Sequence, residues 1–225
     1  MVMYYYFWLM IPALLLSLYA QARVGSTFRK FSKIRTESGI TGAMTARRML
    51  DDGGLNDVDV VRISGNLTDN FNPKKGIISL SDSVHSSSSV SAVGVAAHET
   101  GHALQHRDEY GPMKLRSFLV PIANIGSIAG PYIAIAGLIF SIDILLELGI
   151  ILFSAAVLFY LVTLPVEMNA SRRAMELLET GEILNNDELV SAKKVLNAAA
   201  LTYIAAALSA IMTLVRLILI SRNRR

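Results

Sequence analysis

The sequence contains no cysteine, and this absence restricts the chemistry that the protein can use. No disulfide stabilises the fold, and no thiolate serves as a nucleophile or as a metal ligand. Charged residues are also scarce, at 17% of the chain, whereas 52% of the residues are hydrophobic. Because this composition is unusual for a soluble domain, we expect a lipid bilayer to be part of the protein's surroundings. Any metal site must be built from histidines and carboxylates.

Long apolar runs are abundant in the rest of the sequence. Four of them come close to, or exceed, the roughly 20 residues that a helix needs to cross a bilayer. These runs are residues 2–22, 118–140, 146–164 and 198–220. We therefore predict a mainly α-helical membrane protein with about four transmembrane helices. The polar residues between the first two runs leave room for one compact extramembrane domain.

The alternation of apolar and polar segments divides the chain into five parts. They are a transmembrane anchor helix (1–22), a polar block (23–117), a transmembrane helical hairpin (118–164), a helical segment (165–197), and a transmembrane helix with a basic tail (198–225). The anchor has a rival interpretation, because Ala20-Gln21-Ala22 is similar to a signal-peptide cleavage site. An uncleaved anchor is favoured, since no basic residue precedes the run and a basic cluster starting at Arg23 follows it.

Lysine and arginine residues are concentrated near the membrane ends of the two polar segments. Positive charge in such places is typical of the cytoplasmic side. Three arginines of the C-terminal tail, Arg222, Arg224 and Arg225, would lie on the opposite side and weaken this assignment. We predict that the polar segments face the cytoplasm. The basic residues are not interleaved with aromatic ones, which argues against a nucleic-acid partner despite the net charge of +3.

The polar block shows signals for both helices and strands. Residues 41–52 have apolar positions at helical spacing and end at Gly53-Gly54, which predicts a short amphipathic helix. Residues 58–64 and 76–81 are rich in valine and isoleucine, and we expect two strands joined by a loop that contains Leu67-Thr68-Asp69. Residues 86–89 are predicted to form a loop. An apolar helical pattern then runs from Val90 to Leu104.

The motif His98-Glu99-Thr100-Gly101-His102 lies inside this predicted helix. Its two histidines are four residues apart, so they share one helix face and can reach one zinc ion. Glu99 is rotated by about 100° around the helix axis, which puts it beside the metal as a general base for a zinc-activated water. The alternative without catalysis is that these polar residues form an exposed or salt-bridged helix face. The small apolar neighbours of the motif argue against it, because burying three polar side chains is costly.

A catalytic zinc site needs a third protein ligand and an open position. His106, eight residues after His98, is too far along a straight helix to reach the same ion, and we interpret it as an interface or structural histidine. His85, in the loop before the helix, stays a candidate ligand or transition-state donor.

Glu167 is the favoured third ligand, because it follows the third apolar run on the same side of the membrane as the motif. It begins a helical run after Pro165, and the small residues Ala170, Ser171 and Ala174 would allow this run to approach the motif helix closely. The alternative is an interfacial carboxylate paired with Arg172 or Arg173.

These segments resemble the YugP-like neutral zinc metallopeptidases of bacterial membranes, a family whose activity is assigned largely from its motif. The similar segments are LTD at 67–69, GVAAHETGHA at 94–103, LRSFLVP at 115–121 and LPVEMNASRRA at 164–174. The resemblance implies one zinc ion per chain on His98, His102 and Glu167, with Glu99 as the base. It also implies a small α+β, zincin-like cytoplasmic domain that carries the HExxH helix.

Two positions differ from the pattern that the resemblance implies. We expect histidine and aspartate where this chain has Asn70 and Asn169. A carboxylate next to Glu167 could orient a histidine ligand, so Asn169 is a candidate accessory residue whose change could weaken activity.

The leading functional prediction is hydrolysis of peptide bonds at the membrane surface. The expected partners are the lipid bilayer and a polypeptide substrate, such as a membrane-associated or misfolded protein. An alternative is a zinc-stabilised, catalytically weak scaffold or adaptor, although a structural site has no need of Glu99. A transporter is disfavoured, because the apolar runs hold few charges near the middle of the bilayer.

Overall fold

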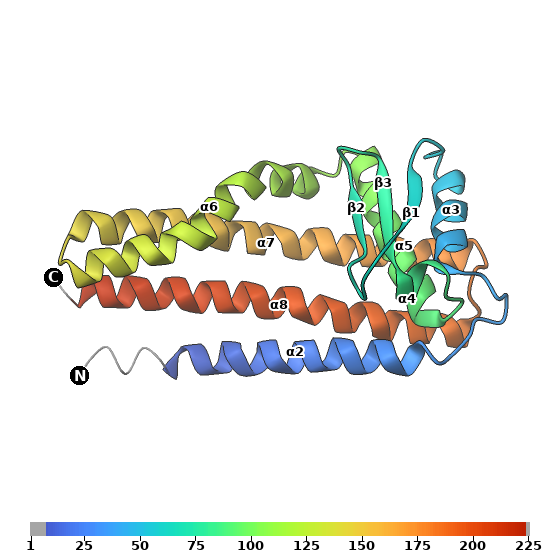
Figure 1. Cartoon of the computed structure of the whole chain (residues 1–225), viewed down its shortest axis with the longest axis horizontal. Coiled ribbons are helices and arrows are strands. Elements are labelled where there is room, and N and C mark those ends of the chain that lie inside the picture. The colour runs from blue at the N-terminus through green and yellow to red at the C-terminus, as the bar shows by residue number, and fades with distance from the viewer. Residues whose placement is uncertain (1–7, 224–225) are drawn as a thin grey trace. The chain divides into compact units, whose positions relative to one another are not determined.

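The computed structural model describes residues 8–223 and is mainly helical (Figure 1). The helices are α2 (Met10–Phe31), α3 (Gly42–Asp52), α4 (Asp82–His85), α5 (Val90–Arg107), α6 (Gly111–Ile139), α7 (Asp143–Thr180) and α8 (Asn186–Arg222). The strands are β1 (Asp59–Ile63), β2 (Asn70–Asn72) and β3 (Ile77–Ser81). The chain forms two compact units. We call them the apolar unit, with described residues 8–21, 111–165 and 201–223, and the polar unit, with residues 22–110 and 166–200.

Within the described residues, α6, α7 and α8 are long and apolar enough to cross a membrane. They contain the predicted spans 118–140, 146–164 and 198–220, apart from one residue at the end of the first. The predicted span 2–22 lies partly outside the described residues. Helix α2 does not meet the same criterion of length and composition, because polar and basic residues such as Arg23 occupy its second half. Four spans therefore stay a prediction, and three candidate spans are established.

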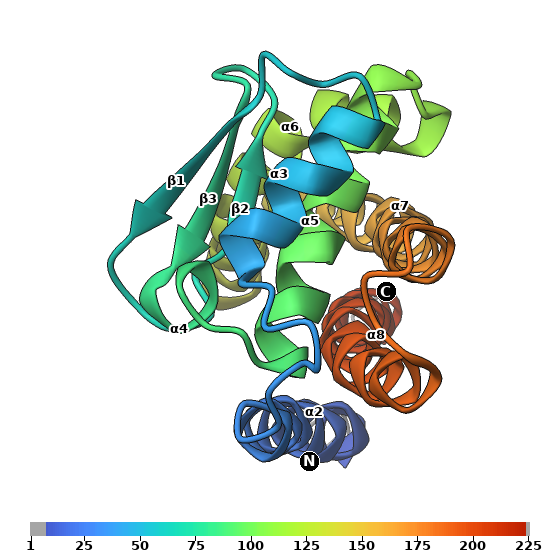
Figure 2. The ribbon, with the colours of Figure 1, turned by 90° about the vertical axis from the view of Figure 1, so that its right-hand side faces the viewer.

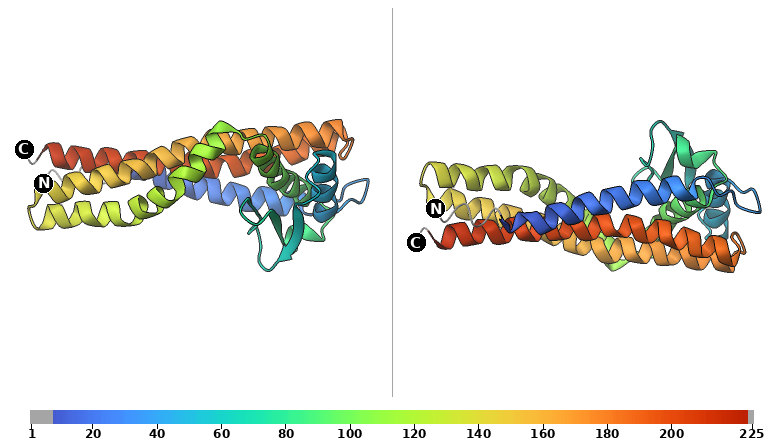
Figure 3. Two further views of the ribbon diagram at one scale, coloured as in Figure 1. Left: turned by 90° about the horizontal axis from the view of Figure 1, so that it is seen from above. Right: turned by 90° about the horizontal axis from the view of Figure 1, so that it is seen from below.

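The apolar unit is held together by small residues and a narrow core. Figure 3 shows α6, α7 and α8 running side by side in this unit. Their buried contacts are made by Ala134, Leu146, Phe153, Ala156, Val157, Ala210 and Leu217. Large apolar side chains such as Ile128 and Ile151 are exposed instead. This arrangement is typical of helices whose outer surface faces lipid.

The polar unit contains a three-stranded sheet with the order β1-β3-β2. Strand β1 runs parallel to β3, with Val60 opposite Ile78, and β2 runs antiparallel to it, with Phe71 also opposite Ile78. Figure 2 shows α3 and α5 on one side of this sheet. A shared core lies between them and includes Leu50, Ile78 and Ala96. The sheet therefore supports the helix that carries the HExxH motif.

Helix α5 is covered on its other side by a second core. Val93 and Ala97 of α5 pack there against Ala174 of α7 and Ala192 of α8. Of the 18 residues of α5, 14 are buried, and they include the polar side chains of Glu99, His102 and Gln105.

Most predicted elements of the polar block are confirmed. Helix α3 begins at Thr41, whose hydroxyl accepts a hydrogen bond from the Met44 amide, and the two predicted strands form β1 and β3. Helix α5 covers the predicted helix and extends to Arg107. The loop between the predicted strands holds a third strand, β2, which the sequence did not reveal. It has only three residues, with an asparagine at either end, so it lacks the alternation of a longer strand.

Two other expectations were wrong. Glu167 does not begin a new helical run after Pro165, because α7 continues through the proline without interruption. A proline costs a helix one hydrogen bond, but neighbouring helices can compensate this loss in a membrane protein. His85 does not lie in a loop either, since it is the last residue of the short helix α4.

Candidate metal centre

The candidate site lies entirely in the polar unit, where α5 and the second part of α7 approach closely. Gly101 makes this approach possible, because a Cβ atom added there would lie only 2.5 Å from the carbonyl oxygen of Ala170. The predicted role of small residues on α7 is confirmed by this contact. His102 is next to Gly101, and Glu167 is one helical turn before Ala170. The close approach therefore brings the motif helix and the candidate third ligand together.

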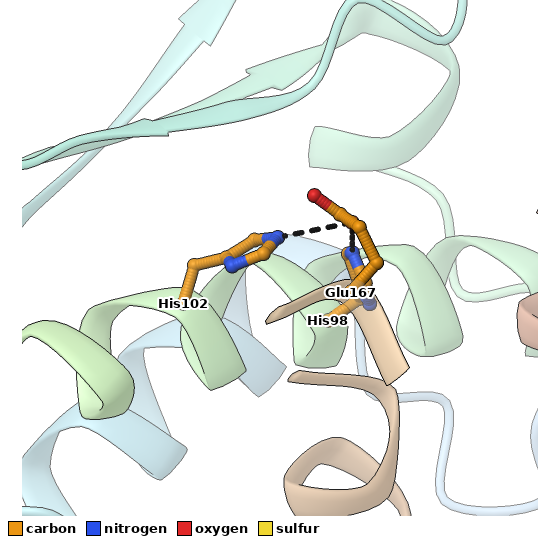
Figure 4. Close-up of side chains that lie close together, drawn as sticks. All are labelled: His98, His102 and Glu167. Atoms are coloured by element: carbon orange, nitrogen blue, oxygen red, sulfur yellow. Dashed lines mark hydrogen bonds and ion pairs between the residues drawn. The ribbon is translucent and has the colours of Figure 1, made fainter. Parts of the chain in front are cut away.

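His98, His102 and Glu167 point toward one another in this region (Figure 4). The Nε2 atom of His98 lies 3.2 Å from Oε2 of Glu167, and Nε2 of His102 lies 3.4 Å from the same oxygen. One donor atom from each residue lies within 4.8 Å of the others. The Glu167 side chain is only 3% exposed. Three donor atoms thus converge on one small, largely buried space.

The other ring nitrogen of each histidine also has a partner. Nδ1 of His98 is 3.1 Å from the hydroxyl of Ser171, and Nδ1 of His102 is 3.0 Å from Oε1 of Gln105. Metal-binding histidines usually have such a partner, which fixes the ring orientation. Two imidazoles and one carboxylate are a donor set that suits zinc. The residues present therefore fit a zinc ion, with His98, His102 and Glu167 as the groups that would hold it.

The electrostatics of the cluster favour a positive charge between its members. Burial disfavours the charged form of His102, but the carboxylates of Glu167 and Glu99, together with the Gln105 hydrogen bond, outweigh burial and raise the pKa of the imidazole. A bound cation would satisfy the same preference. It would have to displace the proton, because a histidine ligand must be neutral.

Glu99 lies beside this cluster and is 8% exposed. Burial raises the pKa of its carboxyl group, although the neighbouring His98 and His102 oppose this rise. A cation on the cluster would lower this pKa again, since a bound ion is the largest charge in such a site. Glu99 is thus a buried carboxylate next to the three donors, where the sequence predicted a base. Its role stays a prediction.

The other candidate residues lie apart from the cluster. The ring of His106 lies 6.0 Å from the ring of Phe71, so it contacts β2, and Nδ1 of His85 lies 3.1 Å from the hydroxyl of Ser86. Arg172 is 3.9 Å from Glu176, and Arg173 pairs with Asp108. Glu167 faces the histidines, as the third-ligand interpretation requires. The accessory role of His85 stays untested.

Asn169 and Asn70, the two positions where the resemblance implies other residues, have different surroundings. The Oδ1 atom of Asn169 accepts hydrogen bonds from Gln105 Nε2 and Arg173 Nε, each at 2.9 Å. Asn70 is exposed at the start of β2 and donates to the backbone oxygen of Thr68. Gln105 thus connects Asn169 to His102 by hydrogen bonds, whereas Asn70 has no such connection among the described residues.

Gln105 was missed by the sequence interpretation, although it contacts His102 directly. A signal for it exists, because it follows His102 by three residues on the same helix and so shares its face. Asp69 was noted only as part of a motif. Its carboxylate accepts hydrogen bonds from the amide and hydroxyl of Ser81, while burial raises its pKa. Asp69 therefore joins the loop before β2 to the end of β3.

Comparisons with known proteins show which family the chain belongs to. Residues 6–222 match the model of the family described as "putative neutral zinc metallopeptidase". The chain is also similar to "Putative membrane protease YugP" of Bacillus subtilis (strain 168), with 47% identity over 220 residues that cover 98% of each chain. No solved structure matches the chain. A match over nearly the whole length establishes the family, and the chain therefore belongs to the family of putative neutral zinc metallopeptidases.

Proposed function

We propose that the protein is a membrane-bound, zinc-dependent metallopeptidase that cleaves polypeptides at the cytoplasmic face of the membrane. The observation that carries this proposal is that the Nε2 atoms of His98 and His102 lie 3.2 and 3.4 Å from Oε2 of Glu167. The family description and the name of the Bacillus relative support the same activity. One zinc ion per chain would bind to these three atoms.

The chemistry assigns separate roles to the ligands and to Glu99. A zinc ion on the three side chains would lower the pKa of water and polarise a peptide carbonyl group. In this proposal, the Glu99 carboxylate takes a proton from the attacking water and returns it to the departing amine. Its burial beside the cluster supports this role, because a buried carboxylate has few competing water contacts.

The neighbourhood of the cluster suits an extended polypeptide. Among the described strands, β2 is an edge of the sheet, and it contacts α5. An edge strand offers unpaired backbone groups to which an extended chain can add. Substrates that are unfolded and close to the bilayer, such as misfolded or membrane-associated proteins, fit such an edge best.

The proposal is tested by measuring bound zinc and peptide hydrolysis on the detergent-solubilised protein, purified without chelators. Glu167→Gln should lose zinc and activity. Glu99→Gln should retain zinc but lose activity by about 10²–10⁴-fold, the range for a general base. Glu179→Gln, an exposed position on the same helix as Glu167, is the matched control and should behave as wild type.

Each outcome of this experiment has a distinct meaning. Wild-type protein without zinc would overturn the metallopeptidase assignment. Stoichiometric zinc without hydrolysis of any unfolded polypeptide would favour the zinc-stabilised scaffold. Full zinc in Glu167→Gln would move the third ligand elsewhere, and His85→Ala would then be tested.

The cytoplasmic orientation has its own test, for which the absence of cysteine is convenient. Single cysteines at Lys75, in the polar unit, and at Phe140, between α6 and α7, can be probed in intact cells with a membrane-impermeant maleimide. Both positions are exposed. We expect labelling of Phe140→Cys from outside and protection of Lys75→Cys. The opposite pattern would reverse the orientation.

A further inference from the structure

We propose that Gln105 is a positioning residue that holds His102 in the tautomer needed for metal binding. The inference rests on the proposed zinc site and adds a residue to it. Gln105 is fully buried on α5, and its side-chain amide lies between His102 and α7. It contacts a ligand rather than the substrate, so it acts through His102.

The orientation of the Gln105 amide is determined by two acceptors. Its Nε2 donates to the backbone oxygen of Val166 at 2.7 Å and to Oδ1 of Asn169 at 2.9 Å. A carbonyl oxygen can only accept, so the nitrogen end of the Gln105 amide must face Val166. Its oxygen end consequently faces His102.

The side-chain amide of the second acceptor, Asn169, is itself oriented by a further residue, Arg173. Its Oδ1 also accepts from Nε of Arg173, and a guanidinium group has donors but no acceptor. The oxygen of Asn169 must therefore face Arg173 and Gln105 together. Arg173 is held in turn by the carboxylate of Asp108, the residue that caps the end of α5. A continuous chain of hydrogen bonds thus runs from Asp108 to His102.

This chain determines which nitrogen of His102 carries the proton. Oε1 of Gln105 can only accept, so Nδ1 of His102 must be the donor in their 3.0 Å hydrogen bond. In the neutral imidazole, Nε2 then has the free lone pair. That nitrogen is the one facing Glu167 at 3.4 Å. Once a metal has displaced any proton on Nε2, Gln105 therefore leaves His102 in the tautomer that a metal ligand needs.

His98 has no equivalent restraint from its own partner. The hydroxyl of Ser171, 3.1 Å from Nδ1 of His98, can donate or accept a hydrogen bond. Either tautomer of His98 can be accommodated by this contact. The two candidate ligands thus differ, with His102 fixed by an amide and His98 paired with an adaptable hydroxyl.

The same geometry explains how Asn169 can replace the aspartate that the family pattern implies. Only an oxygen is used at this position, since Oδ1 accepts from both Gln105 and Arg173. An aspartate would offer the same acceptor. Asn169 therefore supports His102 indirectly, through Gln105, and its amide nitrogen is not needed for this role.

The test measures the affinity for Zn²⁺ by competition with a chelator, on the full-length protein in detergent. Gln105→Met keeps the volume but removes both polar atoms, and we expect Zn²⁺ affinity to fall by about 10–100-fold. Thr100→Val is the matched control. Thr100 is equally buried on the same helix, but its hydroxyl bonds only to the helix backbone at Ala96, so Zn²⁺ affinity should not change.

A second pair of variants tests the chain one step further from His102. Asn169→Leu removes the acceptor and should weaken Zn²⁺ binding, whereas Asn169→Asp retains it and should bind Zn²⁺ as wild type does. Melting curves of the zinc-free variants separate loss of affinity from loss of folding. This pair also decides the question if Gln105→Met does not fold.

The outcomes distinguish this inference from the proposed function. If wild type binds no Zn²⁺, the metallopeptidase assignment fails. If wild type binds Zn²⁺ and Gln105→Met binds it equally well, the positioning role is overturned while the zinc site stands. Equal losses in Gln105→Met and Thr100→Val would also overturn it, since general destabilisation would then be the cause.

Discussion

The apolar and polar units bring their helices together in different ways. In the apolar unit, α6 and α7 meet where Gly126 of one helix faces the backbone oxygen of Leu152 of the other. In the polar unit, α5 and α7 also meet at a glycine, but polar side chains join the same contact. Gln105 and Asn169 are bonded across it. The α6–α7 contact in the apolar unit therefore depends on close backbone packing. The α5–α7 contact in the polar unit combines close packing with a hydrogen bond between side chains.

Helix α7 shows the reason for this difference, because it belongs to both units. Between residues 148 and 164 its exposed side chains are apolar, such as Ile151. In lipid, apolar burial does not drive association, so close backbone contact must hold helices together. After Pro165 the same helix carries Glu167, Asn169 and Arg173. There the sheet and α5 supply a buried environment in which a polar cluster can be positioned.

Removal of zinc should have the largest effect on activity and stability. It should destabilise the polar unit and leave the apolar unit unchanged. We expect a chelator to abolish peptide hydrolysis. Zinc at about 1,000 times its Kd would stabilise the folded polar unit by about 4 kcal/mol, and chelation removes this contribution. Hydrogen exchange should therefore rise in α5 and stay unchanged in α6. A similar rise in both helices would mean that the two units unfold together.

Gly101→Ala should damage the polar unit more than any other single added methyl group on α5. The added Cβ would lie 2.5 Å from the Ala170 oxygen, about 1 Å closer than atoms pack comfortably. We expect a loss of about 1–3 kcal/mol in unfolding free energy. Zinc affinity should also fall, because α7 must move and Glu167 moves with it. Chemical denaturation and chelator competition measure the two effects.

Gly94→Ala is the matched control on the same helix. A Cβ at Gly94 would make an ordinary contact, 3.6 Å from the Cβ of Ala192. Alanine favours a helix over glycine by up to about 1 kcal/mol, so this variant should be as stable as wild type or more stable. Equal destabilisation by both substitutions would show that the Gly101 contact has no special importance.

Much of the polar unit could be predicted from local sequence signals. Thr41 and Gly53 bound α3 as predicted, and the valine and isoleucine runs form β1 and β3. The grouping of Glu167 with the two histidines follows the prediction from membrane topology. The helix ends and strands are marked by residues close together in the sequence, and the position of Glu167 follows from the side of the membrane on which its segment lies. A single sequence is therefore sufficient to predict these features.

The remaining features depend on tertiary contacts that no local pattern encodes. Strand β2 exists because Phe71 and its neighbours pair with β3, and three residues carry no periodicity of their own. Helix α7 passes through Pro165, a residue that would end most helices in water. Gln105 gains its role only when Val166 and Asn169 of α7 lie beside it. Each case requires knowledge of what lies next to the segment in space.

Gly126→Ala tests the apolar unit in the same way that Gly101→Ala tests the polar one. The added methyl group would meet the backbone oxygen of Leu152, which cannot turn aside. We expect about 1–3 kcal/mol of destabilisation, seen as faster hydrogen exchange in α6 and α7 before Pro165. Zinc affinity should be unchanged. Gly111→Ala, with open space around the new methyl group, is the control. A large loss of zinc binding in Gly126→Ala would contradict the separation of the two units.

The smallest expected effect concerns the outer end of the hydrogen-bonded chain, the pair of Arg173 with Asp108. Asp108→Asn should destabilise the zinc-free protein by less than about 1 kcal/mol at neutral pH, because the pair is partly exposed to water. Arg107 and Arg173 lower the pKa of Asp108. A carboxylate with a lowered pKa stabilises the fold above its unfolded pKa of about 4, and this contribution is lost as the pH falls through the folded value. The unfolding free energies of wild type and Asp108→Asn should therefore differ at neutral pH and converge in acid.

If the two unfolding free energies differ equally at neutral and acid pH, the charge of Asp108 is not the cause. If they differ by several kcal/mol at neutral pH, the surface end of the polar unit contributes as much as its buried centre, and the contrast with the apolar unit is greater than the contacts indicate.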